Sequence, residues 1–231
     1  MRLNKYIAKA GIASRRKADI LISEGKIQVN GEVIINFSYQ VKEQDVVIYN
    51  GKILSSEADV VYLINKPKGY VCSNSDKYNK KNVFDLIDSG SRLFTVGRLD
   101  RDTTGVLLIT NNGDLSYRLT HPKYQVEKKY YAISKVDIEN KNLGKVQKGI
   151  TLDDGDRVKA FFKRLDKKDG KIFWDILLTE GKNREIKRIF EHFDSKVISL
   201  HRYQFSNIQV GSLKSGNYRK LNKKEIAQID K

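Results

Sequence analysis

Gly97-Arg98-Leu99-Asp100-Arg101-Asp102-Thr103-Thr104-Gly105 is the stretch from which this chain is best interpreted, and it leads directly into the apolar run Val106-Leu107-Leu108-Ile109. Glycines bracket the segment and aspartates lie between them, which is typical of a turn. The apolar run predicts a buried strand after that turn. An acidic turn in a strongly basic chain indicates a catalytic carboxylate that meets a polyanion.

The composition is that of a folded basic protein. The chain has 231 residues, of which 39% are hydrophobic, and a formal net charge of +16. This length allows one large domain or two small ones. Nucleic acid is the first partner to consider, because phosphate neutralisation favours clustered Lys and Arg. An anionic membrane surface is a weaker alternative, and a basic protein without such a partner is a third.

Several functional classes are disfavoured by what the sequence lacks. The single cysteine, Cys72, excludes an intramolecular disulfide and a cysteine-based zinc site. The three histidines lack metal-binding spacing, and no Rossmann or P-loop glycine pattern occurs. We therefore expect no metal. Without a signal peptide or a run long enough to span a bilayer, we expect no membrane partner and a cytoplasmic location.

The N-terminal part predicts a small module of two helices and a short sheet. Apolar spacing predicts a helix over residues 3–10 and a second one, capped by Ser14, over residues 15–24. The alternation around Asn30-Gly31 predicts a hairpin over residues 27–34. A third strand is expected at residues 46–49.

The second helix begins with three cations, which oppose the helix dipole. These charges either serve another purpose or form a solvated face. The segments Arg2–Ile7, Ser14–Ala18 and Gly25–Gly31 resemble the RNA-binding domain named after the fourth protein of the small ribosomal subunit, the S4 domain. The resemblance implies that residues 1–52 dock on structured RNA and that residues 53–60 form a linker. The residues expected to contact RNA here are Arg2, Lys5, Arg15, Arg16, Lys17 and Lys26.

Residues 61–231 are expected to form a second domain. Strands are predicted at residues 60–64, 107–110, 128–133 and 171–178. A short helix capped by Asp114 and an amphipathic helix over residues 183–193 accompany them. Strands interleaved with a few helices predict a mixed, mainly antiparallel α+β domain.

Three segments of this domain carry candidate chemistry, and each has a simpler alternative. Aspartates often cap turns, which fits Asp102, whereas Arg98 and Arg101 beside Asp100 stabilise an ionised carboxylate. In the segment 127–131, Lys128 and Tyr130 share a strand face. Such a tyrosine either stacks on a base or fills the core.

The third segment, residues 180–188, has a glycine followed by a basic helix start, which is a plausible anion site. Arg184 and Arg188 are four residues apart and repel each other, so we expect something negative nearby. A surface helix with solvated arginines is the alternative.

Together, and in this order, these segments are similar to the pseudouridine synthases, specifically the ribosomal-RNA subfamily with an S4-type N-terminal domain. The matching segments are Asn65–Gly69, Gly97–Asp100 with Asp102, Thr103 and Gly105, Glu127–Tyr130, Glu180–Arg188 and Gly216–Leu221. The resemblance implies an α+β fold, with a small α/β RNA-binding domain followed by a mainly antiparallel catalytic domain.

The resemblance also implies roles for single residues. Asp100 matches the catalytic aspartate, Tyr130 the tyrosine that packs on the target base, and Lys187 the cation that pairs with the aspartate. Arg98 stands where the family has an arginine beside the nucleophile. At the position of Glu185 the family often has a glutamine. The expected substrate-pocket residues are Leu99, Asp102, Thr103 and Ile186. Further RNA contacts are expected from Lys66, Lys68, Asn183, Arg184 and Arg188.

The implied reaction isomerises a specific uridine of ribosomal RNA to pseudouridine. No net oxidation or hydrolysis occurs, so no cofactor is expected. The aspartate either adds covalently to the sugar or base or removes a ribose proton, and the sequence leaves both routes open.

The expected partner is ribosomal RNA or a ribosomal assembly intermediate, bound by a monomer. Residues 124–128 and 183–185 look more like the branch that acts on large-subunit (23S) RNA than the small-subunit (16S) branch. The alternative function is a non-catalytic rRNA-binding factor for ribosome assembly. Loss of Asp100, Tyr130 or Lys187 would indicate it, and all three are present.

Overall fold

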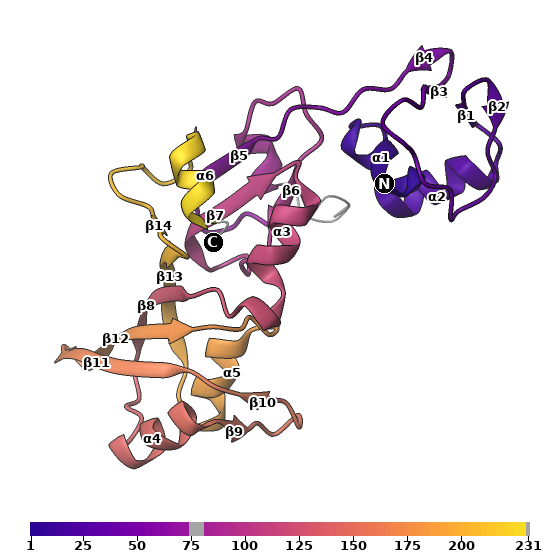
Figure 1. The fold of residues 1–231 in the computed structure, drawn as a ribbon. Helices are drawn as coiled ribbons and strands as arrows, with labels where there is room; N and C mark the ends of the chain where they lie inside the picture. Colours follow the sequence, from indigo (N-terminus) through magenta and orange to yellow (C-terminus); the bar gives the residue numbers. More distant parts are fainter. Residues whose placement is uncertain (74–80, 230–231) are drawn as a thin grey trace. The chain divides into compact units, whose positions relative to one another are not determined.

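The computed structural model describes residues 1–73 and 81–229 (Figure 1). By its internal contacts the chain divides into two compact units. One unit comprises Met1–Val60 with Ser89–Leu93, and the other comprises Val61–Asp88 with Phe94–Lys231. Each unit has its own hydrophobic core, so the two are described separately.

The first unit has two helices and a small antiparallel sheet with strand order β2-β1-β3-β4. Its elements are α1 (Leu3–Lys9), α2 (Arg15–Ser23), β1 (Ile27–Val29), β2 (Glu32–Val33), β3 (Val47–Tyr49) and β4 (Lys52–Ile53). The predicted cap is confirmed, because the Ser14 side chain accepts a hydrogen bond from the Lys17 N–H at 3.3 Å. Asn30 and Gly31 both have positive φ, as a tight two-residue hairpin requires.

The core of this unit is formed by the apolar faces of α1 and α2 on the sheet. Leu3, Ile7, Ala18, Ile22 and Ile27 are completely buried there. Strand β4 and the buried Leu54 extend the unit beyond residue 52, into the segment expected to be a linker. Leu54 explains the difference, since its side chain packs on this core.

The second unit is built on one large sheet. Within the described residues this sheet has nine strands, seven of them in the order β11-β12-β8-β13-β7-β5-β15, while β14 pairs with β13 and β6 with β7. The β13–β7 pair is parallel, whereas β8–β13 and β5–β7 are antiparallel. The predicted mixed, mainly antiparallel α+β class is therefore confirmed. The strands of this sheet are β5 (Val61–Lys66), β6 (Phe94–Val96), β7 (Thr104–Thr110), β8 (Lys128–Ser134), β11 (Phe161–Lys168), β12 (Lys171–Leu178), β13 (Val197–Phe205), β14 (Ile208–Gln209) and β15 (Tyr218–Lys220).

Short helices and a small hairpin complete this unit. The helices are η1 (Val83–Leu86), α3 (Gly113–Thr120), η2 (Pro122–Tyr124), α4 (Asn140–Lys148), α5 (Glu185–His192) and α6 (Lys223–Ile229), and the hairpin is formed by β9 (Ile150–Thr151) and β10 (Arg157–Val158). Helix α5 packs on β11 and β12 through Phe190, which makes edge-to-face contacts with Phe162 and Trp174. A second cluster joins β5, β7, α3 and α6 through residues such as Leu63, Leu108, Leu115 and Ile229.

Two predicted helix starts are wrong by one or two residues. Helix α3 is capped by Asn112, whose side chain accepts from the N–H groups of Asp114 and Leu115, so Asp114 is not the cap. Helix α5 begins at Glu185 because Arg184 has φ 49°, a left-handed conformation that a helix cannot contain. Strand β7 begins at Thr104, three residues earlier than predicted, where it pairs with β13.

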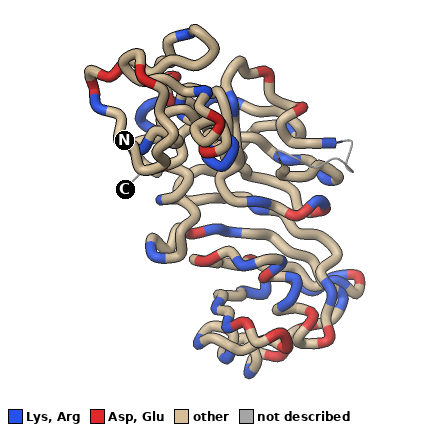
Figure 2. Tube along the Cα trace, turned by 90° about the vertical axis from the view of Figure 1, so that its right-hand side faces the viewer, with Lys and Arg blue, Asp and Glu red and all other residues tan. Residues whose placement is uncertain are grey.

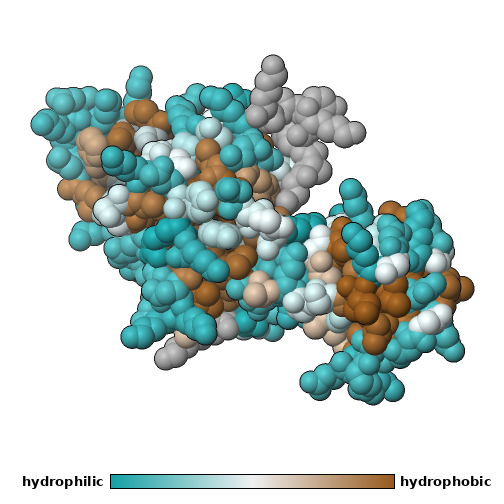
Figure 3. Space-filling view, turned by 90° about the horizontal axis from the view of Figure 1, so that it is seen from above, coloured by the Kyte–Doolittle hydropathy of each residue, from teal (hydrophilic) through white to brown (hydrophobic). Residues whose placement is uncertain are grey.

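In the described ranges no helix is long and apolar enough to cross a membrane. The face seen in Figure 3 is mostly hydrophilic, with separate hydrophobic areas.

Candidate active site

The acidic motif forms the loop between β6 and β7, and a buried lysine holds its backbone. The Lys66 ammonium donates to the carbonyl groups of Thr103 at 2.9 Å, Pro67 at 3.1 Å and Arg101 at 3.3 Å. Lys66 is fully buried, and burial lowers the pKa of its side chain. The burial of Lys66 does not support the expectation that it contacts RNA, because its ammonium donates to two loop carbonyls and to that of the adjacent Pro67.

Lys187 of helix α5 meets both aspartates of this loop. Its Nζ lies 2.8 Å from Oδ2 of Asp100 and 2.6 Å from Oδ1 of Asp102. The Lys187 side chain is 7% exposed, whereas those of Asp100 and Asp102 are 30% and 59% exposed. Partial burial disfavours the ionised Asp102, but the hydrogen bond and charge of Lys187 outweigh it and lower the pKa of that carboxyl.

One cavity collects seven of the eight predicted catalytic and substrate-pocket residues, together with Arg184 from the predicted RNA contacts. Its predicted members are Arg98, Leu99, Asp100, Thr103, Tyr130, Arg184, Ile186 and Lys187. Asp102 does not line this cavity, and its carboxylate instead faces Lys187. The assignment of Asp102 to the substrate pocket therefore stays a prediction, which its contact with Lys187 links to the cavity.

Strand β8 supplies Tyr130 to the cavity wall. The strand alternates strictly, with Lys128, Tyr130 and Ala132 on the buried side and Tyr131 exposed on the other. The predicted sharing of one face by Lys128 and Tyr130 is confirmed. Burial, together with the nearby Arg202 cation, lowers the pKa of Lys128 to about 8.

The cavity also contains residues that were not predicted. These include Lys128, Leu178, Leu200, Arg202 and Phe205, of which the last three lie on β13. The signal for this strand was present in the apolar residues that recur between Val197 and Phe205.

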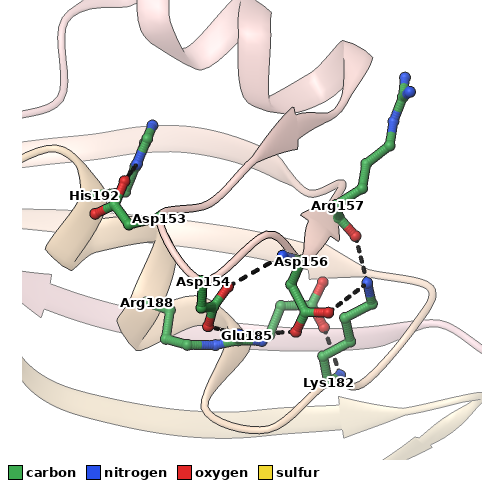
Figure 4. Close-up of polar contacts among 8 residues, drawn as sticks. All are labelled: Asp153, Asp154, Asp156, Arg157, Lys182, Glu185, Arg188 and His192. Atoms are coloured by element: carbon green, nitrogen blue, oxygen red, sulfur yellow. Dashed lines mark hydrogen bonds and ion pairs between the residues drawn. The ribbon is translucent and has the colours of Figure 1, made fainter.

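Helix α5 is held by an acidic loop between β9 and β10 (Figure 4). Arg188 forms ion pairs with Asp154 and, at 2.8 Å, with Asp156. Asp156 also lies 3.5 Å from Lys182, and Asp153 lies 2.8 Å from the His192 ring. The negative charge expected near Arg188 thus comes from this chain. The prediction that Arg188 binds RNA is not supported by its placement, since its side chain is 18% exposed and already paired.

Glu185 lines the cavity and also contacts Lys182, which pairs with the acidic loop. Its Oε2 accepts from the Lys182 N–H at 2.8 Å, whereas its buried Oε1 has no hydrogen-bond partner in the described part of the chain. Burial, together with the nearby Glu180 carboxylate, raises the pKa of Glu185 to about 7. The side chain is therefore mostly neutral below pH 7.

Most of the remaining predicted RNA contacts lie on the surface. Exposed side chains are those of Arg2, Arg15, Arg16, Lys17, Lys26, Lys68, Asn183 and Arg184, and Lys5 is half-buried. Lys26 pairs with Glu24 at 2.7 Å and Arg184 with Glu191 at 3.1 Å. Figure 2 shows basic segments along both units, interspersed with fewer acidic ones. Among described residues no group of three His, Cys, Asp or Glu side chains is placed to hold a metal ion.

Two family models match the chain. The RNA pseudouridylate synthase model matches residues 60–192, and the S4 domain model matches residues 1–47. The chain is 37% identical to ribosomal large subunit pseudouridine synthase B of Bacillus subtilis, covering 99% of this chain and 95% of that protein. It is also 37% identical to an uncharacterised RNA pseudouridine synthase of Aquifex aeolicus, covering 100% and 94%. A crystal structure of a pseudouridylate synthase superposes with a TM-score of 0.71 at 30% identity, covering 99% of both chains.

Proposed function

Because this chain belongs to the RNA pseudouridylate synthase family and carries an S4 domain, we propose that it converts one uridine of large-subunit (23S) ribosomal RNA to pseudouridine, with Asp100 as the catalytic carboxylate. The observation that carries the proposal is the cavity in which Asp100, Lys187 and Tyr130 meet. The name of the Bacillus subtilis relative supports the large-subunit target.

The reaction breaks the bond between uracil N1 and ribose C1′ and forms a bond from C5 to C1′. The C5 proton is released to solvent and N1 takes up one proton, so the product is an isomer of the substrate. Asp100 acts in its ionised form, either by adding to the sugar or base or by removing a ribose proton. Lys187 is the cation that orients this carboxylate and offsets its partial burial. Both routes start from the same ion pair.

The target uridine has to leave its stack before it reaches Asp100, which costs a few kcal/mol. The Tyr130 ring in the cavity wall offers a stacking surface, worth about 1–3 kcal/mol per base. The exposed cations of α2, Arg15 and Arg16, hold the RNA by its phosphates and do not read its sequence.

The test is release of tritium from RNA labelled at uridine C5. Wild-type protein is expected to release the label from 23S rRNA, and Asp100→Ala is expected to bind the RNA without releasing it. Free 23S rRNA and a precursor of the large subunit are compared as substrates. We expect the protein to act as a monomer on either one.

Carbodiimide-adduct primer extension on rRNA from a strain lacking the protein identifies the uridine. A pattern that a chromosomal Asp100→Ala strain shares with the wild type would favour the non-catalytic assembly factor.

A further inference from the structure

Arg202 contacts both the strand that carries Tyr130 and the motif that carries Asp100. It lies on β13, between β8 and β7 in the sheet. Its direct neighbour across the antiparallel β8–β13 pair is Tyr130, and its neighbour across the parallel β13–β7 pair is Gly105. Strand β13 is not part of the sequence motifs. Its residue Arg202 nevertheless contacts both Tyr130 and Gly105, the last residue of the aspartate motif.

The contact with Gly105 is a backbone contact that only glycine permits. Gly105 has φ 104°, and a Cβ at this position would lie 2.1 Å from the Arg202 carbonyl oxygen. Any side chain there would push β13 away from β7. The final glycine of the motif thus fixes the distance of Arg202 from the aspartate loop.

The guanidinium group is buried without a carboxylate. Arg202 is 2% exposed, and within the described ranges its guanidinium hydrogen-bonds a backbone carbonyl and a phenol rather than a carboxylate. Its Nε donates to the Val106 carbonyl at 2.7 Å, and its Nη1 donates to the Tyr130 hydroxyl in a long hydrogen bond of 3.5 Å. The charged group also lies over the rings of Phe205 and Tyr130, at 4.9 Å and 6.0 Å from their centroids.

This arrangement is a poor choice for stability alone. The buried Nη2 has no hydrogen-bond partner among the residues described, and an unpaired buried donor costs free energy. Taking a charged group out of water also costs free energy, which only a well-placed partner offsets. An arginine at this position is therefore better explained by what it does to Tyr130.

We propose that Arg202 is a positioning residue for the isomerisation, which holds the Tyr130 phenol and directs its proton into the cavity. A guanidinium has N–H donors and no acceptor, so the phenol oxygen must accept from Arg202. The phenol O–H is then left to donate to another acceptor, and Tyr130 is one of the residues that line the cavity. This inference rests on the proposed function, because the cavity into which Tyr130 donates is the one in which Asp100 is proposed to react.

A double-mutant cycle tests the proposal. Single-turnover rate constants of tritium release are measured for the full-length wild type, Arg202→Met, Tyr130→Phe and the double variant. Arg202→Met is expected to slow the reaction about tenfold, which corresponds to about 1.4 kcal/mol. In the Tyr130→Phe background, where no phenol oxygen accepts, the same change is expected to cost less than twofold. RNA affinity is expected to stay within about twofold in all variants.

Equal losses of rate in the wild-type and Tyr130→Phe backgrounds would overturn the proposal, because Arg202 would then act on the fold alone. An Arg202→Met variant that loses no activity would also overturn it. If Arg202→Met does not fold, as judged by circular dichroism, Arg202→Lys replaces it in the same cycle. Arg164→Met is the matched control, since Arg164 also lies over an aromatic ring, that of Trp174, but outside the cavity. A wild type that releases no tritium from any RNA would instead reject the proposed function, so the two failures are distinguishable.

Discussion

The Nζ of Lys187 lies 2.8 Å from Oδ2 of Asp100, so helix α5 brings a buried cation directly to the loop between β6 and β7. The two residues both line the cavity and are 87 positions apart in the chain. Asp102 shares the same ammonium at 2.6 Å, but it is about twice as exposed as Asp100 and does not line the cavity. The geometry thus separates two aspartates that the sequence places in one turn.

This separation gives the first prediction. Asp100→Asn, which keeps the size of the side chain, is expected to lower tritium release by at least about 1,000-fold, within the usual range for loss of a catalytic acid–base or nucleophilic group. Asp102→Asn removes a carboxylate at the same ammonium and is the matched control. It is expected to cost less than about tenfold. Equal losses for the two variants would show that the cavity does not distinguish them.

Lys187 is expected to contribute through charge. Lys187→Met removes the cation that both aspartates share, and we expect tritium release to fall about 100-fold while RNA binding changes little. Lys182→Met is the control, because Lys182 also lines the cavity but pairs with Asp156 instead. If Lys187→Met and Lys182→Met reduce the rate equally, the ion pair with Asp100 has no special role.

Features encoded by local sequence were predictable. The Ser14 cap, the Asn30-Gly31 hairpin and the alternation of β8 each depend on residues a few positions apart, and the structure contains all three. The candidate pocket was predictable because the short motifs that carry Asp100, Tyr130 and Lys187 each indicated the same kind of site. Their convergence is consistent with the cavity that Asp100, Tyr130 and Lys187 line.

Features that depend on distant partners were not predictable. Lys66 looks like a surface cation in a Pro-Gly turn, yet its partners Arg101 and Thr103 lie 35 and 37 residues away. Arg188 looks like an RNA contact, but Asp154 and Asp156 reach it across 34 and 32 residues. Pairing over such separations depends on the strand order of the sheet, which residue spacing does not reveal.

Arg188 and Arg184 are expected to behave differently although both were predicted to bind RNA. Arg188→Gln leaves Asp154 and Asp156 without their shared partner and is expected to lower the free energy of unfolding by about 1–3 kcal/mol, as loss of a charged hydrogen bond does. Arg184→Gln, an exposed matched change, is expected to lower RNA affinity and leave stability within about 0.5 kcal/mol. Urea unfolding and RNA titration of both variants check this. Loss of RNA affinity without loss of stability in Arg188→Gln would contradict it.

The first unit is expected to set RNA affinity through the start of α2. Arg15→Ala combined with Arg16→Ala removes two exposed cations and is expected to weaken rRNA binding. It should also flatten the plot of log affinity against log salt concentration by about 1–2 units of slope. The control is Lys42→Ala with Lys52→Ala, which removes the same charge from exposed positions elsewhere in this unit. Identical slopes for the two double variants would mean that only net charge matters.

Glu185 gives the chain a pH-dependent stability that can be removed by one substitution. Its pKa is about 7 in the folded protein because of burial, against 4.5 for the free side chain, so the folded state keeps a proton that the unfolded chain releases between these values. Its contribution to stability is therefore fully present below about pH 4.5 and is lost as the pH rises through about 7. The charged neighbours of this carboxyl are Glu180, Lys182 and Lys128.

Glu185→Gln keeps the acceptor for the Lys182 N–H and cannot ionise. It is expected to match the wild type near pH 4 and to be more stable at pH 8 by about 1–3 kcal/mol, from the 1.36 kcal/mol per pKa unit that linkage gives. Trp174, the single tryptophan, packs on Phe190 of α5, so its fluorescence in urea reports unfolding of this region. Glu139→Gln changes an exposed carboxylate and is expected to bring no gain at pH 8, since Glu139 is paired with Lys141. Equal stabilities of wild type and Glu185→Gln at pH 8 would mean that the Glu185 carboxylate ionises in the folded chain without penalty, which its buried and unpaired Oε1 argues against.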